Sequence, residues 1–548
     1  MKLRKTINLL LLAACNAGQG NAQAASAEYQ QAPFEGLDTF AVNDWWNRKE
    51  CWITPMKVER DEVLAFGLYT VARQTLKLTA QLYPLYPDES RDVYLDIKEN
   101  GRWKQIAKAP VYDLGWSAHF HIADWDDTKD TPYRLRHGDA ASFEGLIRAN
   151  PIHKDEIVLA SLSCNSNQDL GPRDNYVRNL RIQDPDILFF AGDQSYFHKQ
   201  HTAGWLLWGK QFKELIRDRP TITIPDDHDI GQGNLWGEGG KKASTYHGDD
   251  GGYFYSPDYV RMVERCQTWH LPDPYDSTPV EQGIGVYYSA YPIGGIELAI
   301  VEDRKFKSGP TGRVPLMGER IDLVLKKDYN PEDLDPAGLT LLGERQLAFL
   351  ENWAQDSAAK PLRAVLSQTG FAGAAHFSGN LDNRVYADLD SNGWPRSGRN
   401  EALEIIRKAG AVHIAGDQHL ATVLRHGIDE HDDGPWSFVS PAIVNNYWSR
   451  WWKPSEGELA STSPIPASGL PWTGRYKDGF GNPITLHAYA NPENADHGAG
   501  YGLIRFRKSE RQVVFECWAR SADVSDPKAS QFPGWPVTID LTTQERVK

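Results

Sequence analysis

Between residues 44 and 150 the chain alternates apolar and polar positions in short runs that are separated by turn residues. Such alternation is typical of strands that bury one face, because successive side chains of a strand point to opposite sides of the sheet. Several short strands at this spacing predict an antiparallel β-sandwich. The clearest runs are 64–71, 76–82, 117–122 and 133–137.

The pattern changes after Asn150-Pro151, where we place a domain boundary. Beyond it, apolar strand-like runs alternate with helical stretches such as 175–183 and 342–354, which predicts an α/β core. The runs 502–506 and 513–518 are typical of a closing strand pair of the same core. The segment 453–491 is rich in Pro, Ser and Gly and is interpreted as a long surface excursion.

The N-terminus has a cationic start followed by an apolar run, 7–14, that is too short to span a bilayer. This pattern indicates a secretion signal. Its end, Leu-Ala-Ala-Cys, resembles the lipobox of bacterial lipoproteins and predicts lipidation of Cys15; an ordinary cut after Ala24 is the alternative. Either cut exports the protein to the periplasm, the outer membrane or the cell exterior. We expect a signal peptide over 1–14, a tether over 15–43, a β-sandwich domain over 44–150 and an α/β domain over 151–548.

The chain has 548 residues and a formal net charge of −14. Without clusters of Lys and Arg, this charge disfavours broad binding of nucleic acid. A small anionic substrate is still compatible with it, because a bound metal reverses the sign of the field within a pocket. Cys51, Cys266 and Cys517 are interpreted as small buried side chains or as disulfide partners.

Polar side chains follow four strand-like runs at the point where each run ends. The tetrapeptide Ala-Gly-Asp-Gln occurs there twice and presents Asp193 and Asp417. Because the carboxyl ends of parallel strands share one edge of a sheet, we expect these side chains to converge. Buried carboxylates are costly without hydrogen bonds or a cation, so the pattern predicts a metal site. Its candidate donors are Cys164, Asp193, Tyr196, Asp227, Asn234, Asp417 and His419.

The order and spacing of these motifs resemble the alkaline phosphatase D (PhoD-like) branch of the metallophosphoesterases from about Leu159 to Trp518. The resemblance implies a four-layer α/β/β/α core, preceded by an Ig- or fibronectin-like domain, with iron and calcium in the site. It rests on Ser163-Cys164, Asp184-Pro185-Asp186, Gly192-Asp193-x-x-Tyr196, Asp226-Asp227-His228-Asp229 and Gly416-Asp417-x-His419, with further matches at 302–306, 343–353, 366–369, 390–395 and 438–441.

The resemblance also implies roles for the candidate ligands. Asp193 would bridge the two metals, and Cys164, Tyr196 and His419 would complete the set around Fe(3+). Asp417 would bind the second cation, Ca(2+).

The remaining ligand of the second cation is open between two residues. Asp227 stands where the wider superfamily has an Asn before the catalytic His. Asn234 is the alternative, although Gly231-Gln232-Gly233 place it farther from His228 than the family pattern implies.

We therefore expect a secreted or lipid-anchored phosphoric ester hydrolase, acting on monoesters, diesters or both through in-line attack by a metal-bound hydroxide. His228 would stabilise or protonate the leaving oxygen. Arg396 and Arg399 are candidate phosphate clamps. The aromatic run 446–452 is either packing or a platform for a sugar or lipid moiety of the substrate.

Two other interpretations compete with this one. A non-catalytic, metal-containing surface lipoprotein could bind glycans through the aromatic loops. The segment 388–393 matches the first half of an EF-hand calcium loop, but the twelfth position is Arg399 instead of Glu, which favours a substrate loop.

Overall fold

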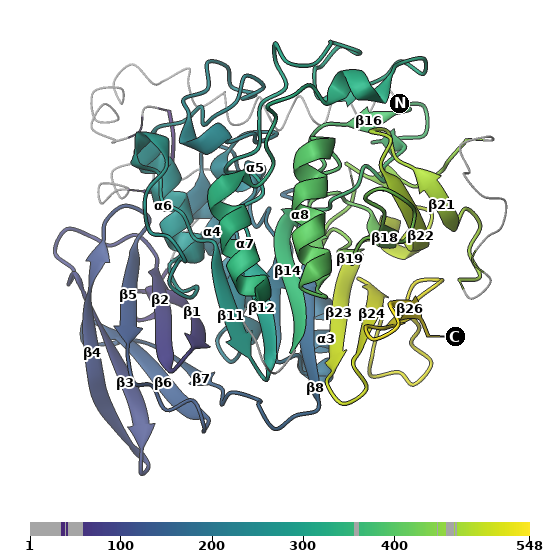
Figure 1. The fold of residues 1–548 in the computed structure, drawn as a ribbon. Coiled ribbons are helices and arrows are strands. Elements are labelled where there is room, and N and C mark those ends of the chain that lie inside the picture. Colours follow the sequence, from purple (N-terminus) through teal and green to yellow (C-terminus); the bar gives the residue numbers. More distant parts are fainter. Residues whose placement is uncertain are drawn as a thin grey trace.

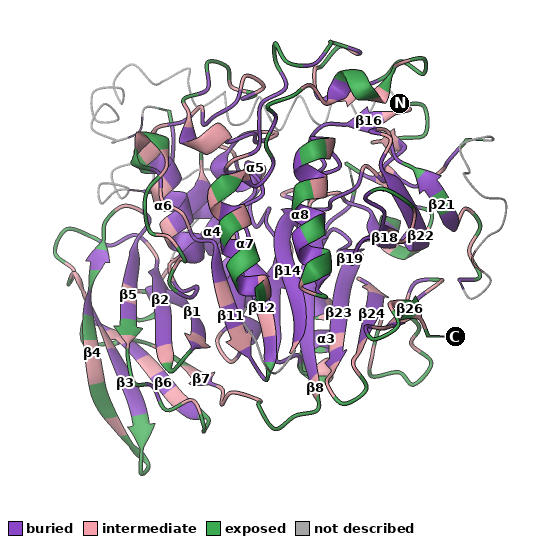
Figure 2. Ribbon diagram, in the orientation of Figure 1, coloured by how far each residue is buried: buried purple, intermediate pink, exposed green. Residues whose placement is uncertain are grey.

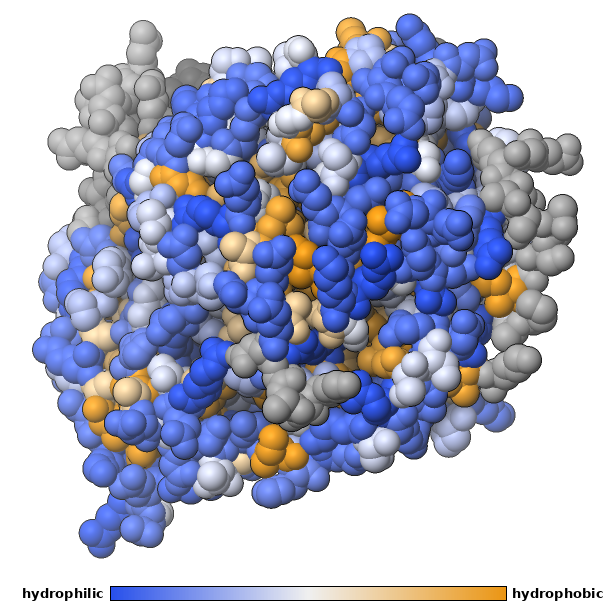
Figure 3. Space-filling view, viewed as in Figure 1, coloured by the Kyte–Doolittle hydropathy of each residue, from blue (hydrophilic) through white to orange (hydrophobic). Residues whose placement is uncertain are grey.

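The computed structural model describes residues 34, 36–38, 40–41, 58–355, 361–446, 448–455, 465 and 468–547. The expected signal peptide, Cys15 and Cys51 lie outside these residues and stay predictions. Within the described part of the chain, no helix has the length and apolar character needed to cross a membrane. The face of the molecule in Figure 3 is mainly hydrophilic, with hydrophobic residues in small separate groups.

The N-terminal strands form one antiparallel seven-stranded sheet in the order β1-β2-β5-β4-β3-β6-β7, drawn in purple and blue in Figure 1. This sheet encloses its own hydrophobic core, which includes Trp116, Trp125 and Tyr133. The four predicted strands are confirmed, whereas the Ig- or fibronectin-like class and the domain boundaries stay predictions. The strands are β1 (Leu64–Ala72), β2 (Thr75–Leu82), β3 (Asp92–Glu99), β4 (Arg102–Tyr112), β5 (Ser117–Ile122), β6 (Thr131–His137) and β7 (Ala141–Ile147), after the 3-10 turn η3 (Arg60–Glu62).

The rest of the chain is a mixed α/β fold, as expected, built on two central sheets. The first has the order β10-β9-β8-β23-β24-β25-β26. Its strands β8, β9 and β10 are parallel, whereas β23 and β24 form the predicted antiparallel closing pair. The bounds are β8 (Glu156–Leu162), β9 (Ile187–Phe190), β10 (Thr221–Thr223), β23 (Gly500–Arg507), β24 (Gln512–Ala519), β25 (Val537–Asp540) and β26 (Glu545–Arg546).

The second central sheet has eight strands in the order β11-β12-β14-β17-β19-β18-β22-β21. Strands β12, β14, β17 and β19 are parallel. The bounds are β11 (Ser289–Ile293), β12 (Ile296–Ile300), β14 (Leu362–Thr369), β17 (Val412–Gly416), β18 (Ala421–His426), β19 (Trp436–Val439), β21 (Gly474–Lys477) and β22 (Pro483–Ala490). Two short ladders pair β13 (Leu323–Val324) with β16 (Ala387–Asp388) and β15 (Phe377–Ser378) with β20 (Arg450–Trp451).

Side-chain alternation along the central strands separates the core into layers. In β8, Leu159 packs into the core between the sheets, whereas Val158 and Ala160 face the helices. Strands β9, β14, β17 and β19 are thus buried on both faces, as the purple β14 of Figure 2 shows. Helices α3 (Asp174–Gln183) and α4 (His201–Ile216) cover the first sheet, and α7 (Gly343–Gln355) and α8 (Arg396–Lys408) cover the second. The other helices are α5 (Asp227–Ile230), α6 (Pro257–Thr268), η4 (Glu238–Gly240), η5 (Glu281–Gly283), η6 (Pro331–Leu334) and η7 (Ala495–Gly498).

The interpretation of 453–491 as a surface excursion is wrong for its second half. Strand β22 is buried along its whole length and pairs with both β18 and β21. Its alternating Ile484, Leu486 and Ala488 provide the strand pattern. The Pro and Gly residues around it mark its turns, and they obscured this pattern in the sequence.

The two central sheets meet at the carboxyl ends of their strands. Ser163 forms a parallel bridge with Ala442, and Ile443 N–H donates to the Ser163 carbonyl at 2.8 Å. Gly416 lies at this junction, where a Cβ atom would overlap the Ser163 side chain. The other Gly of the repeated tetrapeptide is Gly192, which has a φ angle of 105°. A Cβ atom added to it would lie only 2.5 Å from the Cβ atom of Asp226. Both glycines of the repeat are therefore required by close approach.

We expect Gly416→Ala to destabilise the fold by about 1–3 kcal/mol, because the added methyl group forces Ser163 and the sheet junction apart. The urea midpoint of unfolding measures this effect. The matched control is Gly233→Ala, where the structure leaves open space for a Cβ. An unchanged midpoint for Gly416→Ala would show that the two sheets are not in close contact at this point.

Candidate metal centre

The predicted site residues lie on loops that leave the central sheets at this common edge. Cys164 follows β8, Asp193 follows β9, Asp417 and His419 follow β17, and Asp227 begins α5 just beyond β10. Donor atoms within 4.8 Å of one another form three overlapping groups. The groups are Cys164, Asp193 and His419; Asp193, Asp227 and His228; and Asp193, Asp226, Asp227 and Asp417. Asp193 belongs to all three groups, which is the position a bridging ligand requires.

Tyr196 joins the group that contains the thiol. Its hydroxyl donates to Asp193 Oδ2 at 2.7 Å and lies 2.9 Å from His419 Nε2. His419 Nδ1 lies 3.2 Å from the amide oxygen of Asn445, which can only accept, so the proton of the neutral ring is on Nδ1 and the lone pair of Nε2 faces the phenol. Cys164, Asp193, Tyr196 and His419 thus present sulfur, carboxylate, phenol and imidazole donors to one point.

Within the three donor groups, two buried carboxylate oxygens have no hydrogen-bond partner among the described residues. They are Oδ1 of Asp193 and Oδ1 of Asp227, whose side chains are almost fully buried. A buried carboxylate oxygen without a partner loses its hydration and gains nothing in return. These two oxygens belong to adjoining donor groups, so a cation between them would satisfy both. The residues present therefore fit a metal centre.

Burial and mutual repulsion oppose ionisation of these groups. Burial raises the pKa of Asp193 well above its usual range, and the neighbouring Asp227 and Asp226 carboxylates raise it further. Burial likewise raises the pKa of the Tyr196 phenol and of the Cys164 thiol. All three would bind a metal in their anionic forms. Binding of the cation would therefore have to provide the free energy needed to ionise these groups in a buried site.

The backbone is strained at four of the candidate ligands. Cys164, Asp193, Asp417 and His419 have φ angles of 58°, 58°, 66° and 53°, in the left-handed region. Non-glycine residues rarely adopt this conformation, and each instance costs about 1–3 kcal/mol. Such strain persists only where surrounding contacts fix the backbone, as expected for loops that must aim several side chains at one centre.

Asp229 is the main fixing contact. Its carboxylate accepts hydrogen bonds from the backbone N–H groups of Asp193 at 2.8 Å, Ser195 at 3.1 Å and Asp226 at 3.0 Å. Gln267 adds a fourth at 3.0 Å. Burial raises the pKa of Asp229 to about 6 although these donors lower it. One side chain thereby ties the loop after β9 to the loop after β10.

Arg304 is a member of the site that sequence reasoning missed. It is buried, and its guanidinium contacts Asp226 Oδ1 at 2.6 Å, Asp390 Oδ1 at 2.5 Å and Asp417 Oδ1 at 3.2 Å. The sequence marks its segment, 302–306, only through the family resemblance, which gives Arg304 no role in the site. Because Asp390 pairs with this arginine, the segment 388–393 supports the metal centre and is not a separate calcium loop.

The structure treats the two alternative ligands differently. Asp227 lies in two of the three donor groups. Asn234 instead donates to Asp322 Oδ2 at 2.8 Å, and Arg320 holds the same Asp322 carboxylate. This bond uses the amide nitrogen of Asn234 and not the Oδ1 atom that would bind a cation, so both residues stay candidates.

His228 lies at the open side of the centre. Its Nδ1 is 2.6 Å from His198 Nε2, and His198 Nδ1 is 2.7 Å from the Tyr246 hydroxyl. The His228 ring also packs against Tyr196, with centroids 4.2 Å apart. Burial lowers the pKa of His228, and it lowers the pKa of His198 to about 4. Both rings are neutral at physiological pH.

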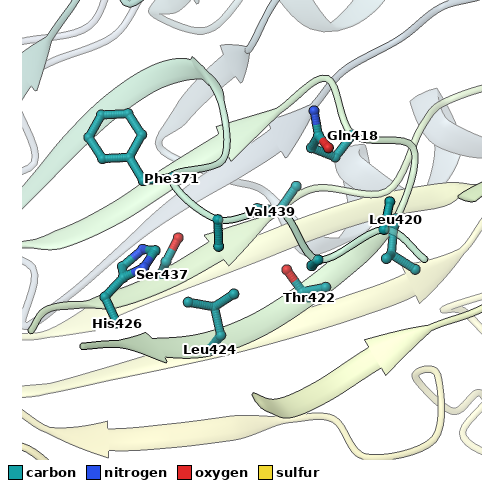
Figure 4. A pocket seen from close by; sticks show the side chains of 11 residues that line it. Phe371, Gln418, Leu420, Thr422, Leu424, His426, Ser437 and Val439 are labelled. Carbon is teal, nitrogen blue, oxygen red and sulfur yellow. The ribbon is translucent and has the colours of Figure 1, made fainter. Parts of the chain in front are cut away.

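The structure does not bring Arg396 or Arg399 into these donor groups. Arg399 is fully buried, and it donates to the Phe371 carbonyl at 2.8 Å and to the Gly427 carbonyl at 2.9 Å. Arg396 pairs with Glu332 at 2.6 Å. The cavity of about 10 Å³ in Figure 4, lined by Phe371 and His426 among others, has room for about one water molecule and none for an ester.

Comparison with known proteins agrees with the sequence motifs. A family model described as PhoD-like phosphatase matches residues 204–458. The solved structure of PhoD is similar, with a TM-score of 0.59 and 14% identity over 90% of this chain and 93% of that chain. Purple acid phosphatase PPD1 from yellow lupin (Lupinus luteus) seeds has a TM-score of 0.52 and 13% identity over 88% and 75%. At these identities the structural likeness shows the fold alone. No curated protein matches the sequence.

We expect Asp193→Asn to raise the thermal midpoint of the chelator-treated protein by about 2–4 °C, which corresponds to roughly 1 kcal/mol in a large domain. The substitution removes one charge from the crowded group, so the metal-free fold becomes more stable, whereas the stabilisation by added metal disappears. Differential scanning fluorimetry with and without metal measures both effects. The exposed Asp328→Asn is the control. A lower metal-free midpoint would contradict the repulsion described for Asp193.

Proposed function

We propose that this chain is exported and acts on phosphomonoesters, phosphodiesters or both with an Fe(3+)–Ca(2+) pair. The premise is the family match, by which the chain is a PhoD-like phosphatase and thus a phosphate ester hydrolase. The observation that supports the metal pair most directly is the position of Asp193. Its unpartnered Oδ1 and the unpartnered Oδ1 of Asp227 lie where two donor groups overlap. A carboxylate shared by two cations is the arrangement that two-metal phosphoester chemistry requires.

Cys164, Asp193, Tyr196 and His419 would hold the ferric ion. Thiolate, phenolate and carboxylate are anionic donors, and three of them around one ion suit a highly charged cation. Burial raises the pKa values of the Cys164 thiol and the Tyr196 phenol, so the cation would displace a proton from each on binding.

Asp227 and Asp417, with the shared Asp193, would hold the calcium ion through oxygen donors alone. We prefer Asp227 to Asn234 because a carboxylate oxygen of Asp227 lies within 4.8 Å of one of Asp193. Asp417 Oδ2 also accepts from Thr369 and Gln418, which fixes the carboxylate before any ion arrives.

When bound, such a metal pair acidifies a water molecule and neutralises charge on the phosphoryl oxygens. The protein's own contribution is positional. Arg304 holds Asp417 from the buried side, and Asp229 holds the Asp193 loop. His228 faces the same centre with a neutral ring, and we assign it the role of donating a hydrogen bond or a proton to the leaving oxygen. Arg396 and Arg399 receive no role, because their donors are engaged elsewhere.

Export and the organisation of the N-terminal part belong to this proposal too. The apolar run 7–14 and its Leu-Ala-Ala-Cys end support an exported protein with a lipid anchor on Cys15. The antiparallel sheet of residues 64–147, with its own core, supports an Ig- or fibronectin-like domain ahead of the catalytic part. A sugar or lipid group of the substrate would meet Trp448, which is 39% exposed, whereas Trp451 and Trp452 are buried.

We expect the purified protein with iron and calcium to hydrolyse 4-nitrophenyl phosphate, bis(4-nitrophenyl) phosphate or both. Chelation should abolish turnover and metal addition should restore it. Asp193→Asn should lower kcat by more than about 100-fold, because loss of a ligand costs more than loss of a residue that supports one. Turnover of neither ester under any metal condition would favour the glycan-binding lipoprotein instead.

We expect the iron-loaded protein to absorb visible light through a ferric phenolate, and we expect Tyr196→Phe to remove the band. Absorption spectroscopy on equal iron loads measures this effect. Tyr287→Phe is the matched control, since Tyr287 is buried and donates nothing to the cluster. A band that persists in Tyr196→Phe would remove Tyr196 from the iron site.

A further inference from the structure

A line of three side chains leads from the candidate leaving-group donor to the rim of the site. His228 Nδ1 lies 2.6 Å from His198 Nε2, and His198 Nδ1 lies 2.7 Å from the Tyr246 hydroxyl. The two imidazole rings are stacked at an offset, with centroids 4.8 Å apart and planes 28° apart. His198 lies on the loop between β9 and α4, whereas Tyr246 lies on the loop between η4 and α6. Three separate segments therefore converge on His228.

Distances and relative acidities determine which atoms of His228, His198 and Tyr246 carry protons. Two N–H groups cannot point at each other across 2.6 Å, so His198 Nε2 and His228 Nδ1 share one proton. A phenol is a stronger acid than a neutral imidazole, and an imidazole nitrogen is a better acceptor than a phenol oxygen. Tyr246 therefore donates to His198 Nδ1, which leaves the proton of His198 on Nε2, directed at His228 Nδ1.

The consequence for His228 is a defined tautomer. With Nδ1 accepting from His198, the proton of a neutral His228 ring is on Nε2. This nitrogen is the one left to meet a bound ester, and a ring nitrogen of His228 lies within 4.8 Å of oxygens of Asp193 and Asp227. Nearby carboxylates also favour an N–H group over a bare lone pair at that position.

We propose that His198 and Tyr246 are positioning residues, which form a directional hydrogen-bond relay that keeps a proton on Nε2 of His228 for hydrogen-bond donation to the leaving oxygen. This inference rests on the proposed function and names the part of the chain that orients its leaving-group donor. In the step itself, the P–O bond to the leaving group breaks, its electron pair stays on the leaving oxygen, and His228 Nε2–H donates a hydrogen bond to that oxygen, which takes a proton from water after release. His228 Nδ1 keeps its hydrogen bond from His198 throughout.

The test compares esters whose leaving groups differ in their need for a proton. A 4-nitrophenolate ion leaves without protonation, whereas a phenolate or an alkoxide gains much more from a donor. We expect His198→Leu to lower kcat for the phenyl ester at least about 10-fold more than for the 4-nitrophenyl ester of the same class. His198→Gln, whose amide N–H can still donate to His228, should recover most of this difference, and Tyr246→Phe should lie between them.

The control is His247→Gln, an exposed histidine that follows Tyr246 directly and should leave both rates unchanged. Equal losses on both esters for His198→Leu and Tyr246→Phe would overturn the relay while leaving the proposed function intact. Turnover of neither ester by the unaltered protein would overturn both. Thermal midpoints verify that each variant is folded, and if His198→Leu unfolds, the same comparison is decided by His198→Gln and Tyr246→Phe.

Discussion

Repulsion among the buried carboxylates of Asp193, Asp226, Asp227 and Asp417 is the interaction on which the rest of the centre depends. Their oxygens lie within 4.8 Å of one another at the edge where the two central sheets meet. In a medium from which water is largely excluded, several like charges at this distance are unfavourable by several kcal/mol unless positive charge is supplied. The fold meets this demand in two ways: with the fixed guanidinium of Arg304 and with donor atoms placed where they could bind a cation.

The backbone around the carboxylates is held in place by groups that never touch a substrate. Asp229 accepts N–H groups from two different strand exits, and Gly192 and Gly416 let the chain pass where any Cβ would collide. These contacts offset the strain of the left-handed residues at the strand ends. These rigid supporting contacts thus keep the candidate metal ligands close together, whereas without them the strand-end loops would relax and the ligands would move apart.

How much of this centre the sequence could predict depends on whether a contact is local. Asp193 and Asp417 were identifiable because each stands directly after an apolar run, and a strand exit is visible in the sequence. Arg304 was not, because its partners Asp226 and Asp390 lie 78 and 86 residues away. The hydrogen bond of Asn234 is hidden from the sequence for the same reason: its amide N–H donates to Asp322, 88 residues later in the chain. Periodicity likewise predicted strands such as 502–506 and 513–518, but not β22 or the residues that cross between the sheets.

The guanidinium of Arg304 and a bound cation would have different consequences for the centre. An arginine cannot deprotonate or leave, so Asp226, Asp390 and Asp417 stay paired whether or not metal is present. Asp193 and Asp227 each keep an unpartnered oxygen, and these oxygens carry the cost that a cation would remove. Because Arg304 already orders half of the carboxylates, a cation that binds the other half loses less free energy to reorganisation of the protein. Arg304 thereby makes the metal site preorganised, although it is not itself a metal ligand.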